Sequence, residues 1–151
     1  MKPEEYAALY KLDMLYGEKL PSIAMEWIET GYDSDALIEL AWESFPTLGD
    51  AAPLFEQGLK DIGVEIPLKE RALVLLGNIY CKQILSGELS PYEGANTIWN
   101  NVCNQAESAN YFSEFVTLAD AILHHSNPEI VERYNARVID ESKKVIELVN
   151  V

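Results

Sequence analysis

The pattern of apolar and polar positions along the chain predicts a series of amphipathic helices. Apolar residues return every three or four positions, which is the period of an α-helix. The longest such run covers 67–86, where apolar side chains occupy most faces and predict a helix central to the core. Gly87 ends this run, and Ser90 with Glu93 forms a capping box that opens the next helix. The segment 67–99 is therefore predicted to be a helical hairpin.

The same period predicts further helices, and each of them ends at a glycine or just before a proline. They cover 3–16, 21–30, 34–45, 50–62, 110–125 and 128–149, and the second arm of the hairpin extends to 107. Asp33 and Asp50 are predicted N-caps, because a short acidic side chain can accept hydrogen bonds from the first free amides of a helix. Residues 64–66 alternate only briefly and are expected to be a linker.

The fold class that follows is all-α, a compact bundle or array of about seven or eight helices in a single domain over 1–151. Gly77 and Gly94 lie inside predicted helices, where each costs about 1 kcal/mol relative to alanine. We expect close helix approach at these two positions, with the arms of the hairpin packed tightly.

The charge of the chain restricts its partners. The formal net charge is −14, from 25 acidic and 11 basic residues. Such a surface repels nucleic acid and anionic lipid and favours a basic protein, although solubility alone is an alternative reason for it. The start of the chain lacks a signal-peptide pattern and no apolar run is long enough to span a membrane, so a cytoplasmic location without membrane contact is expected.

The two cysteines agree with that location. Cys81 and Cys103 each lie among apolar neighbours inside a predicted helix. They are expected to be buried thiols in a reducing compartment. A disulfide between the two arms of the hairpin is the alternative.

Acidic residues are concentrated in stretches that contain no base. No lysine or arginine occurs between Lys19 and Lys60, and that window holds eight acids. Within the predicted helix 34–45, acids recur every four residues, and like charges at this spacing destabilise a helix by about 0.2–0.5 kcal/mol per pair. The stripe consists of Asp35, Glu39 and Glu43, and it is expected to lie opposite Ile38, Ala41, Trp42 and Phe45.

An uncompensated acidic stripe beside aromatic residues is typical of a docking surface for a basic partner. The predicted partner-binding residues are Glu26, Glu29, Asp35, Glu39 and Glu43, with Trp27 and Tyr32 as apolar anchors if they are exposed. The alternative is a solvated acidic face with the tryptophans in the core, as is expected for Trp99.

No catalytic, metal or cofactor motif is present in the sequence, so a non-enzymatic protein without cofactor is expected. His124 and His125 are adjacent and point about 100° apart on a helix, which does not suit a shared metal. Asp120 could share a face with His124, but further ligands are missing. Two alternatives stay open: an enzyme or small-ligand protein with a carboxylate-lined pocket, and a self-associating regulatory adaptor.

Two phrases of the sequence carry a resemblance. They are EWIETGYDS over 26–34 and SGELSPYEGA over 86–95. They resemble phrases in small acidic helical bacterial proteins, some of which are immunity partners of secreted toxins. The resemblance implies an immunity protein whose acidic residues occupy the site where a basic, nuclease-like toxin holds phosphate.

Overall fold

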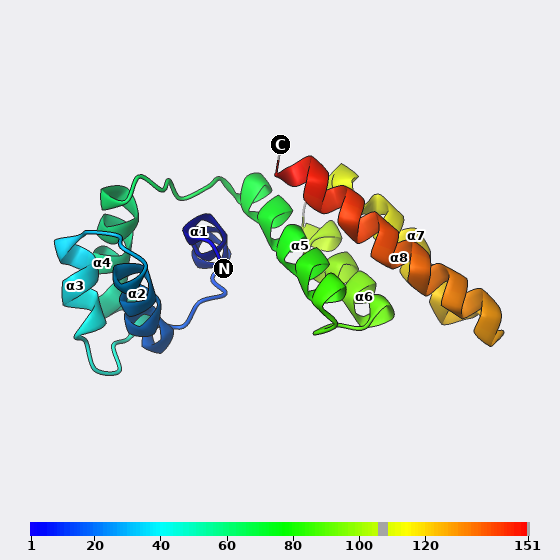
Figure 1. Ribbon diagram of the computed structural model, residues 1–151, viewed down its shortest axis with the longest axis horizontal. Helices are drawn as coiled ribbons and strands as arrows, with labels where there is room; N and C mark the ends of the chain where they lie inside the picture. The colour runs from blue at the N-terminus through cyan, green and yellow to red at the C-terminus, as the bar shows by residue number, and fades with distance from the viewer. Residues whose placement is uncertain (106–108, 151) are drawn as a thin grey trace. The chain divides into compact units, whose positions relative to one another are not determined.

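The computed structural model describes residues 1–105 and 109–150, and within them it is all-α with no strand, as the sequence predicted (Figure 1). The α-helices are α1 (Pro3–Lys11), α2 (Leu20–Glu29), α3 (Asp35–Ala41), α4 (Leu48–Asp61), α5 (Lys69–Ser86), α6 (Pro91–Asn101), α7 (Ser113–His124) and α8 (Pro128–Val149). Short 3₁₀ turns occupy Gly17–Lys19, Cys103–Gln105 and Ala109–Phe112. No helix in the described ranges is both long and apolar enough to span a membrane.

The chain forms two compact units, Met1–Ala72 and Leu73–Val151, and each is described by itself. The single domain over 1–151 stays a prediction. In the first unit α2, α3 and α4 pack against one another around an aromatic centre. The rings of Trp27 and Phe55 stack at 5.7 Å, and Tyr10 packs on Phe55 at 5.1 Å between centroids.

Helix α1 ends earlier than its hydrophobic period suggested. Asp13 adopts a left-handed conformation with φ 57°, and the amide of Met14 donates to the carbonyl of Leu9 at 2.9 Å. This arrangement closes a helix, so α1 stops at Lys11 and the predicted extension to Tyr16 was wrong.

The caps of α3 and α4 also differ from the prediction. The Ser34 hydroxyl, and not Asp33, caps α3 by accepting from the amide of Leu37 at 3.2 Å. Thr47 caps α4, while Asp50 reaches back to Thr47 as the acidic member of a capping box. In both cases the cap is another polar residue suited to capping, one position later for α3 and three positions earlier for α4.

The helical hairpin of the second unit confirms the predicted turn. Gly87 has φ +85°, which favours glycine, and Ser90 and Glu93 exchange the two hydrogen bonds of a capping box at 3.2 Å each. A Cβ at Gly94 would collide with Ile84 of the opposite arm, so this glycine does allow close packing of the hairpin. Gly77 instead meets the ring of Phe112, which lies outside the hairpin.

The remaining helices follow the prediction in part. Helix α8 begins and ends at the predicted residues, but Leu148, predicted to be buried, is exposed, while Val149 and Ser142 are buried. Helix α6 ends at Asn101, not at 107, which lies outside the described residues. Phe112, and not residue 110, occupies the N-cap position of α7 because a 3₁₀ turn precedes the helix, and its side chain makes no capping hydrogen bond.

Both cysteines are free thiols. Cys81 is buried beside Ser142, and burial raises the pKa of its thiol to about 12. Cys103 is half-buried, and burial likewise raises its pKa. The predicted disulfide alternative is therefore not what the structure contains.

The Gly77–Phe112 contact leads to a stability prediction. A Cβ at Gly77 would lie 2.8 Å from one ring carbon of Phe112 and closer still to two others, and Phe112 is fully buried. We expect Gly77→Ala to lower the free energy of unfolding by about 1–3 kcal/mol through overpacking. Urea titration followed by circular dichroism measures this change.

The matched control is Gly49→Ala. A Cβ there meets only the Thr47 hydroxyl at 3.9 Å, and Gly49 lies in the first turn of α4. Alanine should raise the free energy of unfolding by up to about 1 kcal/mol at this position. Equal effects of the two substitutions would contradict the assignment of Gly77 to close packing.

Candidate functional site

Helix α3 packs on the first unit through one narrow face. Its buried residues are Ala36, Leu37 and Leu40. The Leu37 side chain lies directly over Gly58 of α4, where a Cβ would come within 2.5 Å of the leucine Cδ2. This contact brings α3 close to α4, and it leaves the opposite face of α3 in solvent.

That solvent face combines acidic and apolar side chains. Asp35, Ile38, Glu39 and Trp42 are three or four residues apart, so they share one side of the helix. All four are exposed, and the Trp42 side chain has 80% of its surface accessible. The apolar members were predicted to lie opposite the acids. This was wrong, because the side of α3 that faces the core is formed by residues 36, 37 and 40.

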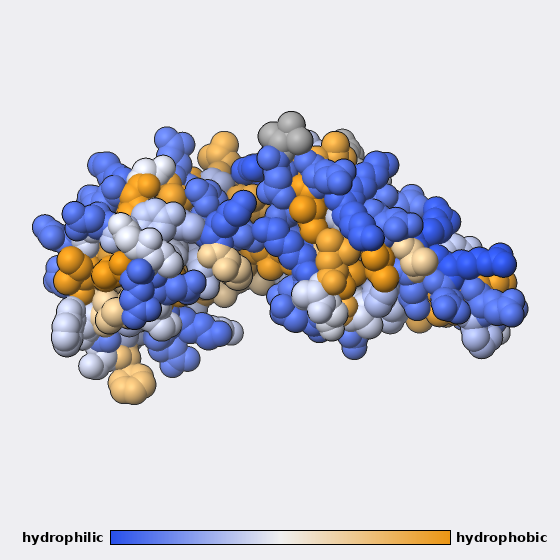
Figure 2. Space-filling model, in the orientation of Figure 1, coloured by the Kyte–Doolittle hydropathy of each residue, from blue (hydrophilic) through white to orange (hydrophobic). Residues whose placement is uncertain are grey.

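The segment after Trp42 leaves the helix. Helix α3 ends at Ala41 rather than at the predicted residue 45, so the third acid of the stripe, Glu43, lies in the following turn. Phe45 adopts φ 49° just before Pro46, and its side chain is 91% exposed. Hydrophobic colour marks the end of this loop between α3 and α4 in the space-filling view (Figures 1 and 2).

We call this segment the α3 surface. It comprises Tyr32, Asp35, Ile38, Glu39, Trp42, Glu43 and Phe45. Within the described residues, none of its three carboxylates lies within 4.0 Å of a lysine or arginine nitrogen. Trp42 and Phe45 also have no ring or cation partner in that part of the chain. Charge and aromatic area are therefore both presented to solvent.

The two predicted aromatic anchors differ in their exposure to solvent. Tyr32 is 40% exposed, but Trp27 is only 2% exposed and belongs to the core, where it stacks on Phe55 and meets Tyr6 edge-on at 5.9 Å. The condition attached to Trp27 is not met, and its role as a docking anchor is withdrawn. Trp99, expected in the core, is half-buried.

The predicted acids on α2 are both exposed, but the structure gives them different surroundings. Glu26 lies close enough to Tyr6 of α1 that its charge, after burial, contributes to raising the pKa of the Tyr6 hydroxyl. This places Glu26 beside α1. Glu29, at the last position of α2, forms no ion pair within the described residues.

Ile38 and Phe45 were not predicted as members of the surface, and Trp42 was predicted as an aromatic neighbour of the acids but not as a binding residue. A signal for two of them was present, because 35, 38, 39 and 42 follow the spacing of a single helical face. The exposure of Phe45 had no such signal. It depends on where α3 ends, and helix ends are set by local backbone conformation that hydrophobic periodicity does not report.

A hydrogen-bond cluster holds the start of α3 against α4. The Ser34 hydroxyl donates to Asp61 Oδ2 at 2.7 Å, and the Gln57 amide donates to Asp61 Oδ1 at 2.7 Å. These two bonds, helped by the charge of Lys60, lower the pKa of the Asp61 carboxyl against the opposing effect of burial. The residue that caps α3 is thus also tied to the end of α4.

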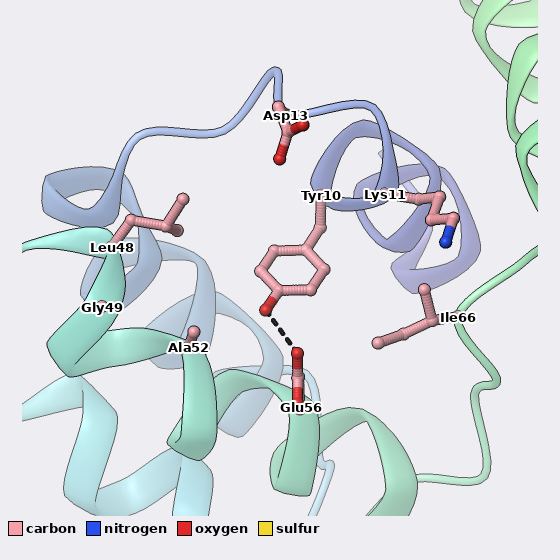
Figure 3. Close-up of a pocket in the computed structure, with 8 residues that line it drawn as sticks. All are labelled: Tyr10, Lys11, Asp13, Leu48, Gly49, Ala52, Glu56 and Ile66. Atoms are coloured by element: carbon pink, nitrogen blue, oxygen red, sulfur yellow. Dashed lines mark hydrogen bonds between the residues drawn. The ribbon is translucent and has the colours of Figure 1, made fainter.

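A second feature of the first unit is an open cavity of about 510 Å³ beside α1 and α4 (Figure 3). Tyr10 forms one side, and its hydroxyl donates to Glu56 Oε1 at 2.6 Å. Burial, this bond and the charges of Glu56 and Asp13 raise the pKa of Tyr10. Leu48 and Ile66 lie on opposite sides of the Tyr10 ring. The cavity combines two carboxylates and the Lys11 side chain with apolar walls.

The two histidines have different contacts, and the ring of His125 packs on that of Tyr134 with 5.5 Å between centroids. A ring nitrogen of His124 lies 2.8 Å from the carbonyl oxygen of Asp120 and 3.4 Å from its carboxylate, and both side chains are exposed. Within the described residues, no group of three or more histidine, cysteine, aspartate or glutamate side chains is arranged to hold a metal ion.

The site and the fold together define an acidic, all-α chain with an exposed acidic and aromatic face. Comparison with protein-family models, with curated proteins and with solved structures found no match. The resemblance to immunity partners of toxins therefore stays a prediction that rests on its two sequence phrases.

The Asp61 cluster predicts how stability depends on pH. Because the folded-state pKa lies below that of the unfolded chain, the stabilisation is present above the ordinary aspartate pKa of 3.8 and is lost as the pH falls through the folded-state pKa. We expect Asp61→Asn to be less stable than the parent chain at pH 6, with the difference shrinking below about pH 4. Chemical unfolding at a series of pH values measures it.

Asp140→Asn is the control, because Asp140 is an exposed acid of α8 with no bond to other side chains in the described residues. Its substitution should leave the pH dependence of stability unchanged. A pH profile of Asp61→Asn parallel to that of the parent chain would show that this cluster does not contribute.

Proposed function

We propose that this chain is a non-enzymatic acidic binding protein that docks a basic protein partner through the α3 surface. The observation that carries the proposal is the exposure of Trp42 and Phe45 beside carboxylates without a basic neighbour. Folding alone favours neither feature, since large aromatic side chains usually lose contact with water and like charges usually alternate with bases.

The charge of the chain supports a basic partner. With a formal net charge of −14, the protein attracts a cationic protein over a distance and orients it before contact. The three carboxylates of the α3 surface provide the local complement. Acidic proteins repel nucleic acid and anionic lipid by the same field, so neither is part of the proposal.

The aromatic side chains provide the apolar part of such an interface. Interface centres are enriched in aromatic residues and depleted of charge, while charged residues surround them. Trp42 and Phe45 fit the first role, and Asp35, Glu39 and Glu43 fit the second. A cytoplasmic location belongs to the same proposal and agrees with the free thiols.

Neutralisation of a toxin is the specific form of this proposal, and it is supported by the two sequence phrases alone. In that form, the carboxylates take the place of nucleic-acid phosphate in the toxin. A toxin gene next to the gene for this chain would favour this form.

A second candidate is small-ligand binding in the cavity beside Tyr10. Its favouring observation is the combination of two carboxylates, Asp13 and Glu56, with the Lys11 side chain at an opening with apolar walls. Protection of Tyr10 and Glu56 amides from hydrogen exchange by a small ligand would support it.

Charge reversal tests the main proposal. We expect Asp35→Lys, Glu39→Lys and Glu43→Lys together to weaken binding of a basic octapeptide of alternating lysine and arginine by at least about tenfold, since each close charge pair contributes up to about 1 kcal/mol. Fluorescence anisotropy at low ionic strength measures the affinity.

The control is a triple reversal with the same change in net charge on α8, at the exposed acids Glu132, Asp140 and Glu147. It removes the same amount of long-range attraction but leaves the α3 surface intact. If both triples weaken binding equally, the peptide responds to net charge and the α3 surface has no special part.

The backbone conformation of Phe45 allows its contribution to binding to be separated from its contribution to stability. At φ 49°, phenylalanine is destabilised sterically by about 1–2 kcal/mol relative to glycine. Its ring is exposed, so replacing it removes few packing contacts. We expect Phe45→Gly to raise the free energy of unfolding by about 1 kcal/mol and to weaken binding of the same octapeptide. Urea titration and anisotropy give the two values.

The result is compared with Asp13→Gly, because Asp13 has a similar φ of 57° outside the α3 surface. Asp13→Gly removes one negative charge but no part of the α3 surface, so it should weaken peptide binding less than Phe45→Gly does. A lower free energy of unfolding in Phe45→Gly would mean that the ring stabilises the fold. It would contradict the inference that Phe45 is kept at a strained position for binding.

A further inference from the structure

We propose that the α3 surface recognises arginine rather than lysine, with the guanidinium group of the partner lying on the Trp42 ring between carboxylates. The occupant is an arginine-bearing segment of a basic protein. This inference rests on the proposed function and specifies the chemistry of its partner.

The spacing on α3 places the required groups together. Residues three and four apart on a helix have Cβ atoms about 5–6 Å apart. Trp42 follows Ile38 by four residues and Glu39 by three, and Asp35 precedes both Ile38 and Glu39 on the same side. A planar cation on the indole ring would therefore lie within reach of the Glu39 carboxylate.

The chain itself contains the same arrangement in its second unit. The guanidinium carbon of Arg137 lies 5.9 Å from the centroid of the Tyr134 ring, and its Nη2 donates to Glu114 Oε1 at 2.7 Å. One arginine is thus shared by an aromatic ring and a carboxylate. The α3 surface has the ring and the carboxylates of such a site without the arginine.

Arginine suits this surface better than lysine for physical reasons. The guanidinium group is planar, weakly hydrated and able to stack on an aromatic face while its edge donates to a carboxylate. The ammonium group of lysine is compact and strongly hydrated, so it loses more on leaving water. Lysine would pair with the carboxylates but would benefit less from Trp42.

A second copy of this chain is a poor occupant of the surface. It would bring a further formal charge of −14 toward three carboxylates that already lack basic neighbours. Exposed aromatic area alone would favour self-association, but the charge around it opposes this. The complementary occupant carries positive charge.

The experiment compares two synthetic twelve-residue peptides that differ only in four positions, all arginine in one and all lysine in the other, separated by glycine and serine. Affinities for the full chain are measured by calorimetry at low ionic strength. We expect the arginine peptide to bind at least about fivefold more tightly. Trp42→Ala should reduce this ratio to about one.

The matched control is Tyr16→Ala, which removes another exposed aromatic side chain of the first unit outside the α3 surface. It should preserve the preference for arginine. Unfolding curves of both variants confirm that the fold is retained, which is expected because both side chains are mostly in solvent.

Each outcome decides between the claims. Equal affinities of the two peptides that depend on the three carboxylates would overturn the arginine inference and leave the proposed function standing. Absence of binding by either peptide would overturn both. A dimer of the chain in light scattering that Trp42→Ala abolishes would assign the surface to a second copy and overturn the inference.

Discussion

The contact between Leu37 and Gly58 determines the arrangement on which the candidate site depends. Because Gly58 has no side chain, Leu37 can approach the backbone of α4, and a short helix with only three buried residues is held in place. The Ser34–Asp61 hydrogen bond at 2.7 Å adds a polar attachment at the start of α3. With one side of α3 committed to the core, its other side faces water.

This arrangement explains how Trp42 and Phe45 come to be exposed. Helix α3 ends at Ala41, so both aromatic residues come after Leu40, the last fully buried residue of the helix. Pro46 prevents a longer helix, since the helical conformation is disfavoured for the residue before a proline. The exposed aromatics are therefore a consequence of helix length, and the strained φ of Phe45 marks a position where folding would prefer glycine.

The charge around this surface separates two kinds of carboxylate in the first unit. Asp61 and Glu56 accept hydrogen bonds from neighbouring side chains and so contribute to the structure of the unit. Asp35 and Glu39 form no ion pair within the described residues and are exposed to solvent. The same distinction applies to aromatic residues, because Trp27 packs in the core while Trp42 is in solvent.

Sequence by itself determined the helical class, the hairpin turn at Gly87 and Ser90 and the full extent of α8, since periodicity, glycine and capping residues act over a few neighbouring positions. It also identified the acids of the candidate surface. Tertiary structure decided which aromatic residues are exposed. Trp27 lies within α2 and Trp42 directly follows α3, and their different burial depends on which face of each helix meets Phe55 or Gly58. That choice is made by packing between distant segments, which local pattern does not contain.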